Sequence, residues 1–401
     1  MTEYKLSRRA FSFATALGPL ALFAPGAAFA AGAAPKTKTL VCVFLRGGLD
    51  GLSAVIPYAD DAYAKQRRQT VIAAPGSGKQ AGLKLDERFA AHPALAPLMP
   101  AWQAGQLGFI HAVGSPHATR SHFEAQDHFE WGGLSAGDGK GWLARAHAAR
   151  GAAGSNLGSV ALANATPLAF RGQPGVVAAR SLDRFGLQAP PKLQPQLEAA
   201  FQRVYAAQGD AIARAGASAL DVAKRLRGIP RAASKKYPSQ SKGLSDVAAL
   251  IRANVGLEVA WVDAGGWDTH QGQAGRLDRN LGLLARGLAA FREDIGDRME
   301  HTLVLVMTEF GRTVKENGTG GTDHGHGSVM FALGGNVHGK KVHGVWPSLS
   351  EDKLHEGRDL AVTTDFRDVF AEVLQTQLGV TNPSAVLGGH RATKQFSLLR
   401  T

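Results

Sequence analysis

Short apolar runs that alternate with helical stretches constrain the fold of this chain most strongly. The runs are rich in Val, Leu, Ile and Phe, and they cover 40–45, 107–113, 257–262, 302–308 and 329–333. Runs of this length and composition are typical of buried strands. Because alternating strands and helices form parallel sheets with helices on both faces, the sequence predicts a large α/β domain with a mostly parallel central sheet.

One segment interrupts this alternation. Residues 151–242 contain a long Ala-, Gln- and Arg-rich stretch, 195–225, that predicts one amphipathic helix, and then a basic stretch with Gly, Pro and Ser. We interpret 151–242 as a helical, cap-like insertion within a single domain over 31–401. Further helices are predicted over 92–104, 121–131, 142–150, 244–255, 277–298 and 364–378.

The N-terminus indicates export. Residues 7–11 (SRRAF) match a twin-arginine pattern, an apolar run over 13–29 follows, and residues 28–30 (AFA) form a small-x-small cleavage signal. We predict a signal peptide over 1–30, transport by the twin-arginine export machinery, and a periplasmic or secreted mature protein. A retained anchor is the alternative, but the run is short and contains two prolines. No later stretch is long and apolar enough to span a membrane.

The composition of the chain indicates which classes of molecule it is expected to bind. The chain carries a net charge of +12 at pH 7, which attracts phosphate or sulfate esters, acidic polysaccharides and envelope lipid surfaces. Nucleic acid is not expected, because the sequence has no basic tract interleaved with aromatic residues. The single cysteine, Cys42, excludes an internal disulfide and lies within the first apolar run, where we expect an inert core thiol.

A glycine-rich segment after the 302–308 run carries the clearest metal signal. Residues 320–327 read GGTDHGHG, so that Asp323, His324 and His326 stand between glycines. Glycine lets side chains crowd around a small ion without Cβ clashes. Asp and His are the ligands of zinc, manganese or iron where no thiolate is available. A solvated turn capped by Asp323 is the alternative, but the short His-rich tract favours metal.

Acidic and imidazole groups also follow the other apolar runs. Asp50 follows the first run, Asp268 and His270 follow the third, and Glu309 follows the fourth. Because parallel strands align their C-terminal ends, we expect these groups to converge with the side chains of the glycine-rich segment. Four carboxylates and three imidazoles are about what one or two divalent ions need, zinc first, with manganese, iron or calcium as alternatives.

Three of these carboxylates also have a structural alternative. Asp50 could cap the turn in which it stands, and Asp268 could cap the turn after the third run. Glu309 could form a local ion pair with Arg312 at a helix start.

A nucleophile is expected at the start of the helix over 121–131. Thr119, Arg120 and Ser121 place two hydroxyls and a cation there, where free N–H groups at a helix N-terminus attract anions. The hydroxyl of Ser121 or Thr119 would attack phosphorus or sulfur, and Arg120 would hold the non-bridging oxygens.

The same region has a purely structural interpretation. Ser121 and Glu124 form the pattern of a capping box, which needs only such a hydroxyl. Nearby, His122 and Asp127 are candidates for further ligands or for side chains that support the ligands. The remaining histidines are interpreted as structural or surface residues: His92, His111, His117, His128, His147, His301, His338, His343, His355 and His390.

Five stretches together resemble a bacterial family of twin-arginine-exported proteins that is classed as a domain of unknown function. The stretches are FLRGGLDGL at 44–52, SHFEAQD at 121–127, WDTH at 267–270, TEFGRT at 308–313 and GTDHGHG at 321–327. The family is similar to a remote branch of the alkaline phosphatase and sulfatase superfamily. The resemblance covers nearly the whole mature chain.

The resemblance implies an alkaline-phosphatase-like α/β/α sandwich with metals at the strand C-termini. The roles that it implies are a metal-binding Asp for Asp50, the nucleophile for Ser121 or Thr119, an Asp–His metal pair for Asp268 and His270, and the late metal-binding His for His324 or His326. The chain departs from the superfamily after the 302–308 run, where Glu309-Phe310-Gly311 stands in place of Asp-His-Gly. Asp323-His324 would supply the missing imidazole from the next loop.

The sequence therefore predicts an exported metal-dependent hydrolase of phosphate or sulfate esters. Its nucleophile is a metal-activated Ser or Thr hydroxyl or a water molecule, and its substrate is an anionic small molecule or a polysaccharide ester. The alternative is a non-catalytic envelope protein with the same fold that binds a polyanion or a protein partner. The basic excess and the missing imidazole motivate that alternative.

Overall fold

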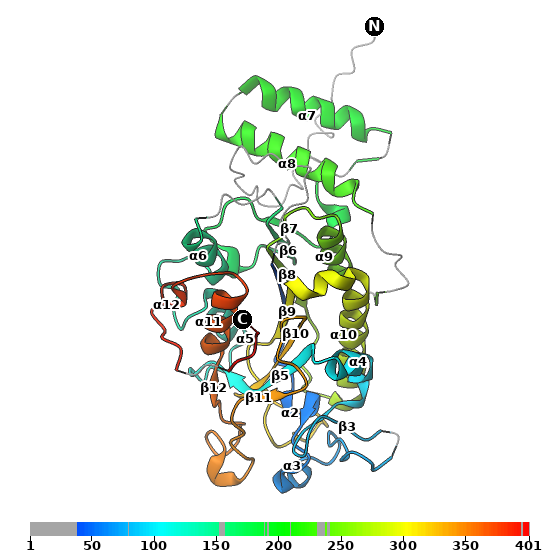
Figure 1. Cartoon of the computed structure of the whole chain (residues 1–401), viewed down its shortest axis with the longest axis vertical. Helices are drawn as coiled ribbons and strands as arrows, with labels where there is room; N and C mark the ends of the chain where they lie inside the picture. Colours follow the sequence, from blue (N-terminus) through cyan, green and yellow to red (C-terminus); the bar gives the residue numbers. More distant parts are fainter. Residues whose placement is uncertain are drawn as a thin grey trace.

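The computed structural model describes residues 38–400, apart from 79, 152–156, 188, 191, 209, 231–236, 239–240 and 394–395. Its centre is one large β-sheet with helices packed on both sides (Figure 1). The strands of this sheet are β1 (Thr39–Leu45), β5 (Leu107–Gly114), β6 (Ser159–Leu162), β7 (Val177–Ala179), β8 (Val259–Ala264), β9 (Thr302–Met307), β10 (Ser328–Gly334), β11 (Val342–His343) and β12 (Thr364–Asp365).

The sheet is mostly parallel, as the sequence predicts. Its strand order is β11-β5-β10-β9-β1-β8-β6-β7, and β12 pairs with β5. Among the described residues, β10 runs antiparallel to its neighbours β9 and β5, and the other pairs are parallel. In the register, Leu45 of β1 stands opposite Ala264 of β8, and Phe44 stands opposite Met307 of β9. The loops after these three strands therefore leave the same edge of the sheet.

Alternate side chains of β1 enter two different hydrophobic cores, one on each face of the sheet. Val41, Val43 and Leu45 enter one core, which also holds residues of α9 (Lys242–Arg252) and α10 (Gln273–Ile295). Leu40, Cys42 and Phe44 enter a second core with residues of α5 (His122–Trp131), α6 (Trp142–Ala149) and α11 (Phe366–Thr376). Because successive side chains of a strand point to opposite faces, the sheet is covered on both sides. The predicted α/β/α arrangement is confirmed.

Short elements complete the fold. A small second sheet has the order β2-β4-β3, with β2 (Val55–Ile56), β3 (Leu83–Lys84) and β4 (Ala90–Ala91). The other helices are α2 (Gly51–Ala54), α3 (Asp61–Gln66), α4 (Met99–Gln103), α7 (Gln194–Gln208), α8 (Ala211–Arg227) and α12 (Pro383–Val386). The 3₁₀ helices are η2 (Pro93–Leu98), η3 (Leu168–Phe170), η4 (Leu182–Arg184), η6 (Gly296–His301) and η7 (Glu351–Lys353).

The segment 151–242 divides into two parts. Its strands β6 and β7 extend the main sheet beyond β8. Its helices α7 and α8 form a hairpin at one end of the molecule, beyond the sheet (Figure 1). The single helix predicted over 195–225 is wrong, because the carboxylate of Asp210 accepts the N–H of Ala213 and starts a new helix there.

Two further predicted helices differ at their starts. The stretch 92–104 forms η2 and then α4, since Pro97 and Pro100 remove backbone donors there. The stretch 364–378 opens as β12, and α11 begins at Phe366. The predicted signal peptide, 1–30, lies outside the described residues. Within the described part of the chain, no helix is both long and apolar enough to cross a membrane.

Candidate metal centre

Four side chains meet where the loops after β8 and β9 approach the start of α5. We call His122, Asp268, His270 and His324 the imidazole cluster. Asp268 Oδ1 lies 3.0 Å from Nε2 of His270, 3.4 Å from Nε2 of His324 and 3.6 Å from Nε2 of His122. The Nε2 atoms of His270 and His324 are 3.0 Å apart. His122, Asp268 and His324 each offer one ligand atom, and these atoms all lie within 4.8 Å of one another, so this group could hold a metal ion.

Each ring of the cluster is held through its other nitrogen. His122 Nδ1 lies 2.8 Å from Glu309 Oε1, and His270 Nδ1 lies 3.0 Å from Asp323 Oδ1. His324 Nδ1 lies 2.8 Å from the backbone carbonyl of Arg120. Metal-binding histidines are typically oriented in this way by a carboxylate or a carbonyl.

The imidazole cluster has more hydrogen-bond acceptors than donors. Carbonyl and carboxylate oxygens only accept, so each neutral ring carries its proton on Nδ1 and presents a lone pair at Nε2. With the rings neutral, three Nε2 lone pairs face the carboxylate of Asp268, and the guanidinium of Arg312 balances its charge only in part. His122 Nε2 is buried without a hydrogen-bond partner among the described residues. This donor set fits a divalent metal ion.

The pKa shifts in the cluster have local causes. Burial lowers the pKa of His324, which favours the neutral ring that a metal requires. The hydrogen bond that His122 donates to Glu309 raises the pKa of His122. Burial opposes ionisation of Asp268, but the hydrogen bond and charge of Arg312 outweigh it and hold the Asp268 pKa below its usual value. The Asp268 carboxylate is thus charged.

Arg312 is the buried cation that ties the loops together. Its guanidinium lies 2.6 Å from Asp268 Oδ1 and donates to the carbonyls of Gly48 (2.8 Å) and Thr322 (3.1 Å). The structure therefore pairs Arg312 with Asp268 rather than with Glu309.

Glu309 is buried behind the cluster. Its Oε1 accepts from the backbone N–H of Gly47 at 2.8 Å and from Gln126 Nε2 at 2.9 Å, in addition to His122. Burial raises the pKa of Glu309, but the bonds from His122, Gln126 and Gly47 outweigh it and hold the pKa below its usual value. Glu309 therefore supports His122, and His122 itself faces the cluster.

Two glycines let these loops approach one another. Gly47 has φ +118°, and a Cβ there would lie 2.6 Å from the backbone nitrogen of Asp268. A Cβ on Gly321 would lie 2.1 Å from the carbonyl oxygen of His270. Any side chain at either position would push the Asp268–His270 loop away from its neighbours.

Asp50 lies in a buried ion pair. Arg67 contacts both of its oxygens, at 2.5 and 3.0 Å, and Ser53 and Gln273 donate to Oδ2 at 2.8 and 2.5 Å. The side chains of Asp50 and Arg67 are both fully buried. Because protein donors occupy these oxygens, we leave Asp50 out of the ligand set.

The two other predicted ligands of the glycine-rich segment also stand outside the cluster. Asp323 holds His270 and accepts from Asn317 at 3.1 Å. His326 Nε2 lies 2.8 Å from the carbonyl of Ser115, and its ring packs against His355 at 4.3 Å. His324 is thus the ring of this segment that enters the cluster.

The three predicted catalytic residues line the entry to α5. Ser121 occupies the N-cap position of α5, but its exposed side chain makes no capping bond. Thr119 Oγ1 donates to Glu124 Oε2 at 2.6 Å, so the predicted capping box does not form. Arg120 is paired with Glu356 at 2.5 Å and with Asp359 at 3.0 Å.

A protein family matches most of this chain. The family described as "Protein of unknown function (DUF1501)" matches residues 88–389, which include the whole imidazole cluster. The chain belongs to this family. The predicted membership of a family without an assigned function is therefore confirmed. The twin-arginine signal and the superfamily placement stay predictions. A search of curated proteins finds no match to this member of DUF1501.

Two solved structures resemble this chain, but less closely than the family does. Ps i-CgsB in complex with k-i-k-neocarrahexaose is 11% identical, with a TM-score of 0.36, over 86% of this chain and 72% of that chain. Alkaline phosphatase from the Antarctic bacterium TAB5 is 12% identical, with a TM-score of 0.28, over 74% of this chain and 91% of that chain. Both TM-scores lie below 0.5, and nothing about the activity of this chain follows from either.

Proposed function

We propose that this chain is a metal-dependent hydrolase of phosphate or sulfate esters, with a divalent ion, zinc by preference, held by the imidazole cluster. The observation that carries the proposal is the convergence of Nε2 of His122, His270 and His324 on the Asp268 carboxylate, with Nε2 of His122 buried and without a partner among the described residues. When bound there, the ion would polarise an ester oxygen and make a hydroxyl nucleophilic at neutral pH.

Ser121 is the residue best placed to supply that hydroxyl. It stands between Arg120, whose carbonyl holds His324, and His122, which belongs to the cluster. Its exposed side chain takes no part in capping, so the hydroxyl is free to attack phosphorus or sulfur. Thr119 is less suited because its hydroxyl is engaged by Glu124. A water molecule at the same place is the alternative nucleophile.

We propose that the N-terminus of α5 binds the anionic group of the substrate. No side chain caps the first turn of this helix at Ser121, so its N–H groups face the entry beside His122. A helix N-terminus favours the non-bridging oxygens of a phosphate or sulfate group through these N–H groups and the helix dipole. Arg120 is bound to Glu356 and Asp359, and we therefore assign it to the support of the loop rather than to the anion.

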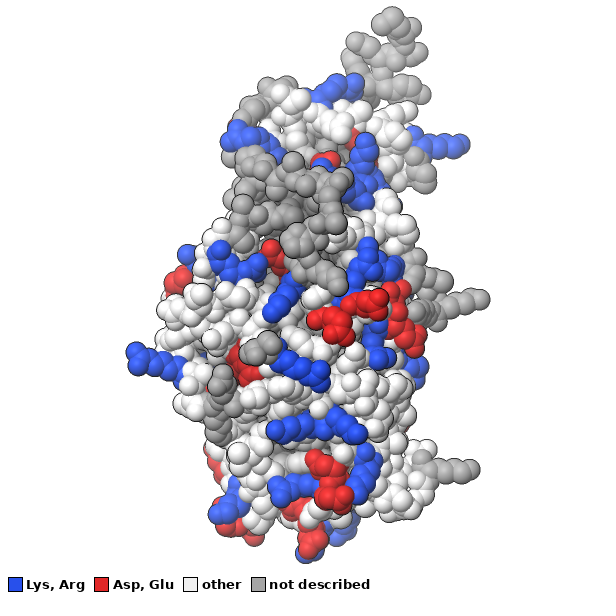
Figure 2. Space-filling model, viewed as in Figure 1, with Lys and Arg blue, Asp and Glu red and all other residues white. Residues whose placement is uncertain are grey.

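The surface charge supports an anionic substrate bound at a specific site. The chain carries a net charge of +12, yet Lys and Arg are interspersed with Asp and Glu on the face shown in Figure 2. On this face the cations form no continuous band of the kind expected on a polyanion-binding surface, and we therefore place the anionic substrate at the imidazole cluster. We propose export through the twin-arginine pathway and an anionic small molecule or polysaccharide ester as substrate.

The test combines metal analysis with an ester screen. Zinc, manganese, iron and calcium are measured in the exported protein, and hydrolysis of aryl phosphates and aryl sulfates is assayed before and after chelation. We expect bound metal, turnover of at least one ester class, loss of turnover on chelation and recovery with Zn²⁺. A protein that binds no metal and leaves every ester intact would exclude the proposal. Salt-sensitive binding of an acidic polysaccharide by both wild type and Asp268→Ala would then favour the polyanion-binding alternative.

A further inference from the structure

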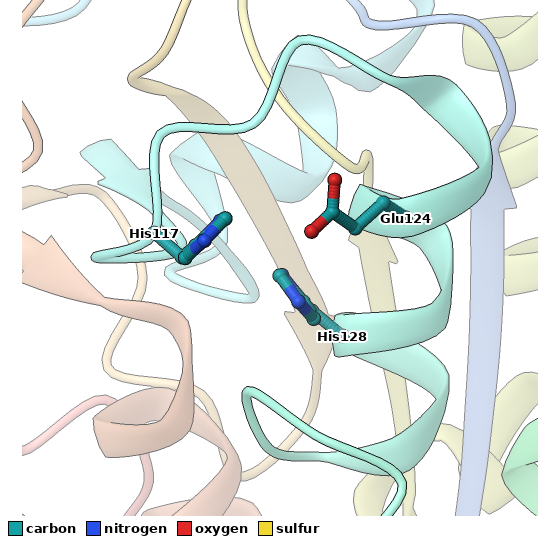
Figure 3. A group of neighbouring side chains, drawn as sticks. All are labelled: His117, Glu124 and His128. Carbon is teal, nitrogen blue, oxygen red and sulfur yellow. The ribbon is translucent and has the colours of Figure 1, made fainter.

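A second group of metal-binding side chains lies on another face of α5. His117, Glu124 and His128 each offer one ligand atom, and these atoms all lie within 4.8 Å of one another. Figure 3 shows the three side chains directed into a shared space, two from the helix and one from the loop that precedes it. Since a helix turns by about 100° per residue, Glu124 and His128 face away from His122 and the imidazole cluster.

Helix geometry explains why two of these side chains meet. Glu124 and His128 are four residues apart on α5 and therefore stand one turn above the other on the same face. His117 reaches this face from the loop after β5, where its backbone N–H donates to Ser115 Oγ at 3.1 Å. The rings of His117 and His128 are 5.1 Å apart and nearly perpendicular.

An unsatisfied buried nitrogen points to a ligand. His128 is 3% exposed, and its Nδ1 has no hydrogen-bond partner among the described residues. A buried polar atom without a partner is costly, and native proteins rarely keep one without a reason. Thr119 donates to Glu124 Oε2, which leaves Oε1 facing the two imidazoles. Arg367, whose charge helps to lower the pKa of His128, is itself paired with Asp365 at 2.6 Å.

We propose that His117, Glu124 and His128 bind a second divalent transition-metal ion, separate from the ion of the imidazole cluster. Two imidazoles and one carboxylate are a common ligand set for zinc and for other first-row metals, with open positions for water. His117 and Glu124 are exposed, so an ion can enter from solvent. The sequence interpretation of His117 and His128 as structural or surface residues is replaced by this one.

The ion would hold the loop that carries Thr119, Arg120 and Ser121. It would join His117, at the start of this loop, to α5, at its end. The Arg120 carbonyl of this loop orients His324 of the imidazole cluster. We therefore expect this ion to raise thermal stability through preferential binding to the folded state.

Zinc titration of the chelator-stripped full chain tests the proposal. We expect His117→Ala and Glu124→Gln each to bind one Zn²⁺ fewer per chain than the wild type, and the increase in Tm with Zn²⁺ to shrink in both. Both substitutions are at exposed positions, so the fold should be retained.

Two outcomes separate this inference from the proposed function. If His117→Ala and Glu124→Gln both bind as much Zn²⁺ as the wild type, the second site is excluded, whatever the activity. If His324→Ala leaves Zn²⁺ binding unchanged while His117→Ala lowers it, the second site stands and the metal centre of the proposed function fails.

Discussion

His324→Ala is expected to remove the ion from the imidazole cluster and to abolish ester hydrolysis. The substitution deletes an Nε2 ligand of the cluster and leaves the ion pair between Asp268 and the buried guanidinium of Arg312 intact, which Asp268→Ala would not do. We expect Zn²⁺ affinity at this site to fall by at least about 100-fold, since even partners of metal ligands contribute 10- to 100-fold. A metal supplies several kcal/mol of transition-state stabilisation, so kcat/KM should fall by about 10³-fold or more.

A matched histidine provides the control. His301 precedes β9, at the opposite end of this strand from the loop that leads to His324. His301→Ala should leave metal content and kcat/KM unchanged. Circular dichroism and thermal unfolding of both variants check that the fold survives. Hydrolysis by His324→Ala at the wild-type rate, with wild-type Zn²⁺ content, would show that the cluster is not the catalytic centre.

Asp50→Ala is expected to destabilise the protein strongly without removing the metal. It leaves the guanidinium of Arg67 buried and unpaired, because both Asp50 oxygens contact it in a fully buried pair. Breaking a buried pair in this way typically costs about 3–5 kcal/mol. We expect a much lower denaturation midpoint, with Zn²⁺ content per folded chain unchanged. As a control, Asp352→Ala removes one member of the exposed Asp352–Lys353 ion pair and should shift the denaturation midpoint little.

The ion pair of Asp50 and Arg67 also predicts how the stability of the protein depends on pH. Burial opposes ionisation of Asp50, but the charge and hydrogen bonds of Arg67 outweigh it and hold the Asp50 pKa below its usual value. A carboxylate with a depressed pKa contributes stability above its unfolded pKa, and this contribution is lost as the pH falls through the folded value. The stability difference between wild type and Asp50→Ala should therefore shrink in acid. A difference that grows as the pH falls, or loss of Zn²⁺ from well-folded Asp50→Ala, would contradict this account.

The sheet could be predicted because its strands are buried on both faces. Continuous apolar runs such as 40–45 and 302–308 leave little choice of structure, and the observed strands Thr39–Leu45 and Thr302–Met307 nearly coincide with them. The break between α7 and α8 was missed because the stretch over 195–225 keeps a helical composition throughout. The Gly209-Asp210 pair, a typical helix stop and start, was the available signal.

The candidate site could be predicted only in part. Asp268, His270 and His324 follow strand ends and meet as expected, because the parallel register aligns those ends. His122 was a secondary candidate, since its approach depends on where α5 starts and on the buried bond to Glu309. The pairing of Asp50 with Arg67 could not be read from the sequence, because it depends on the tertiary contact between the C-cap residue of α3 and the N-cap residue of α2.

The most direct test of the metal centre is a crystal structure of the zinc-loaded protein with diffraction data collected on both sides of the zinc absorption edge. We expect an anomalous difference peak at about 2.0–2.1 Å from ligand atoms of His122, Asp268 and His324. A protein crystallised with saturating Zn²⁺ whose anomalous map has no peak among the side chains of the imidazole cluster would contradict this expectation.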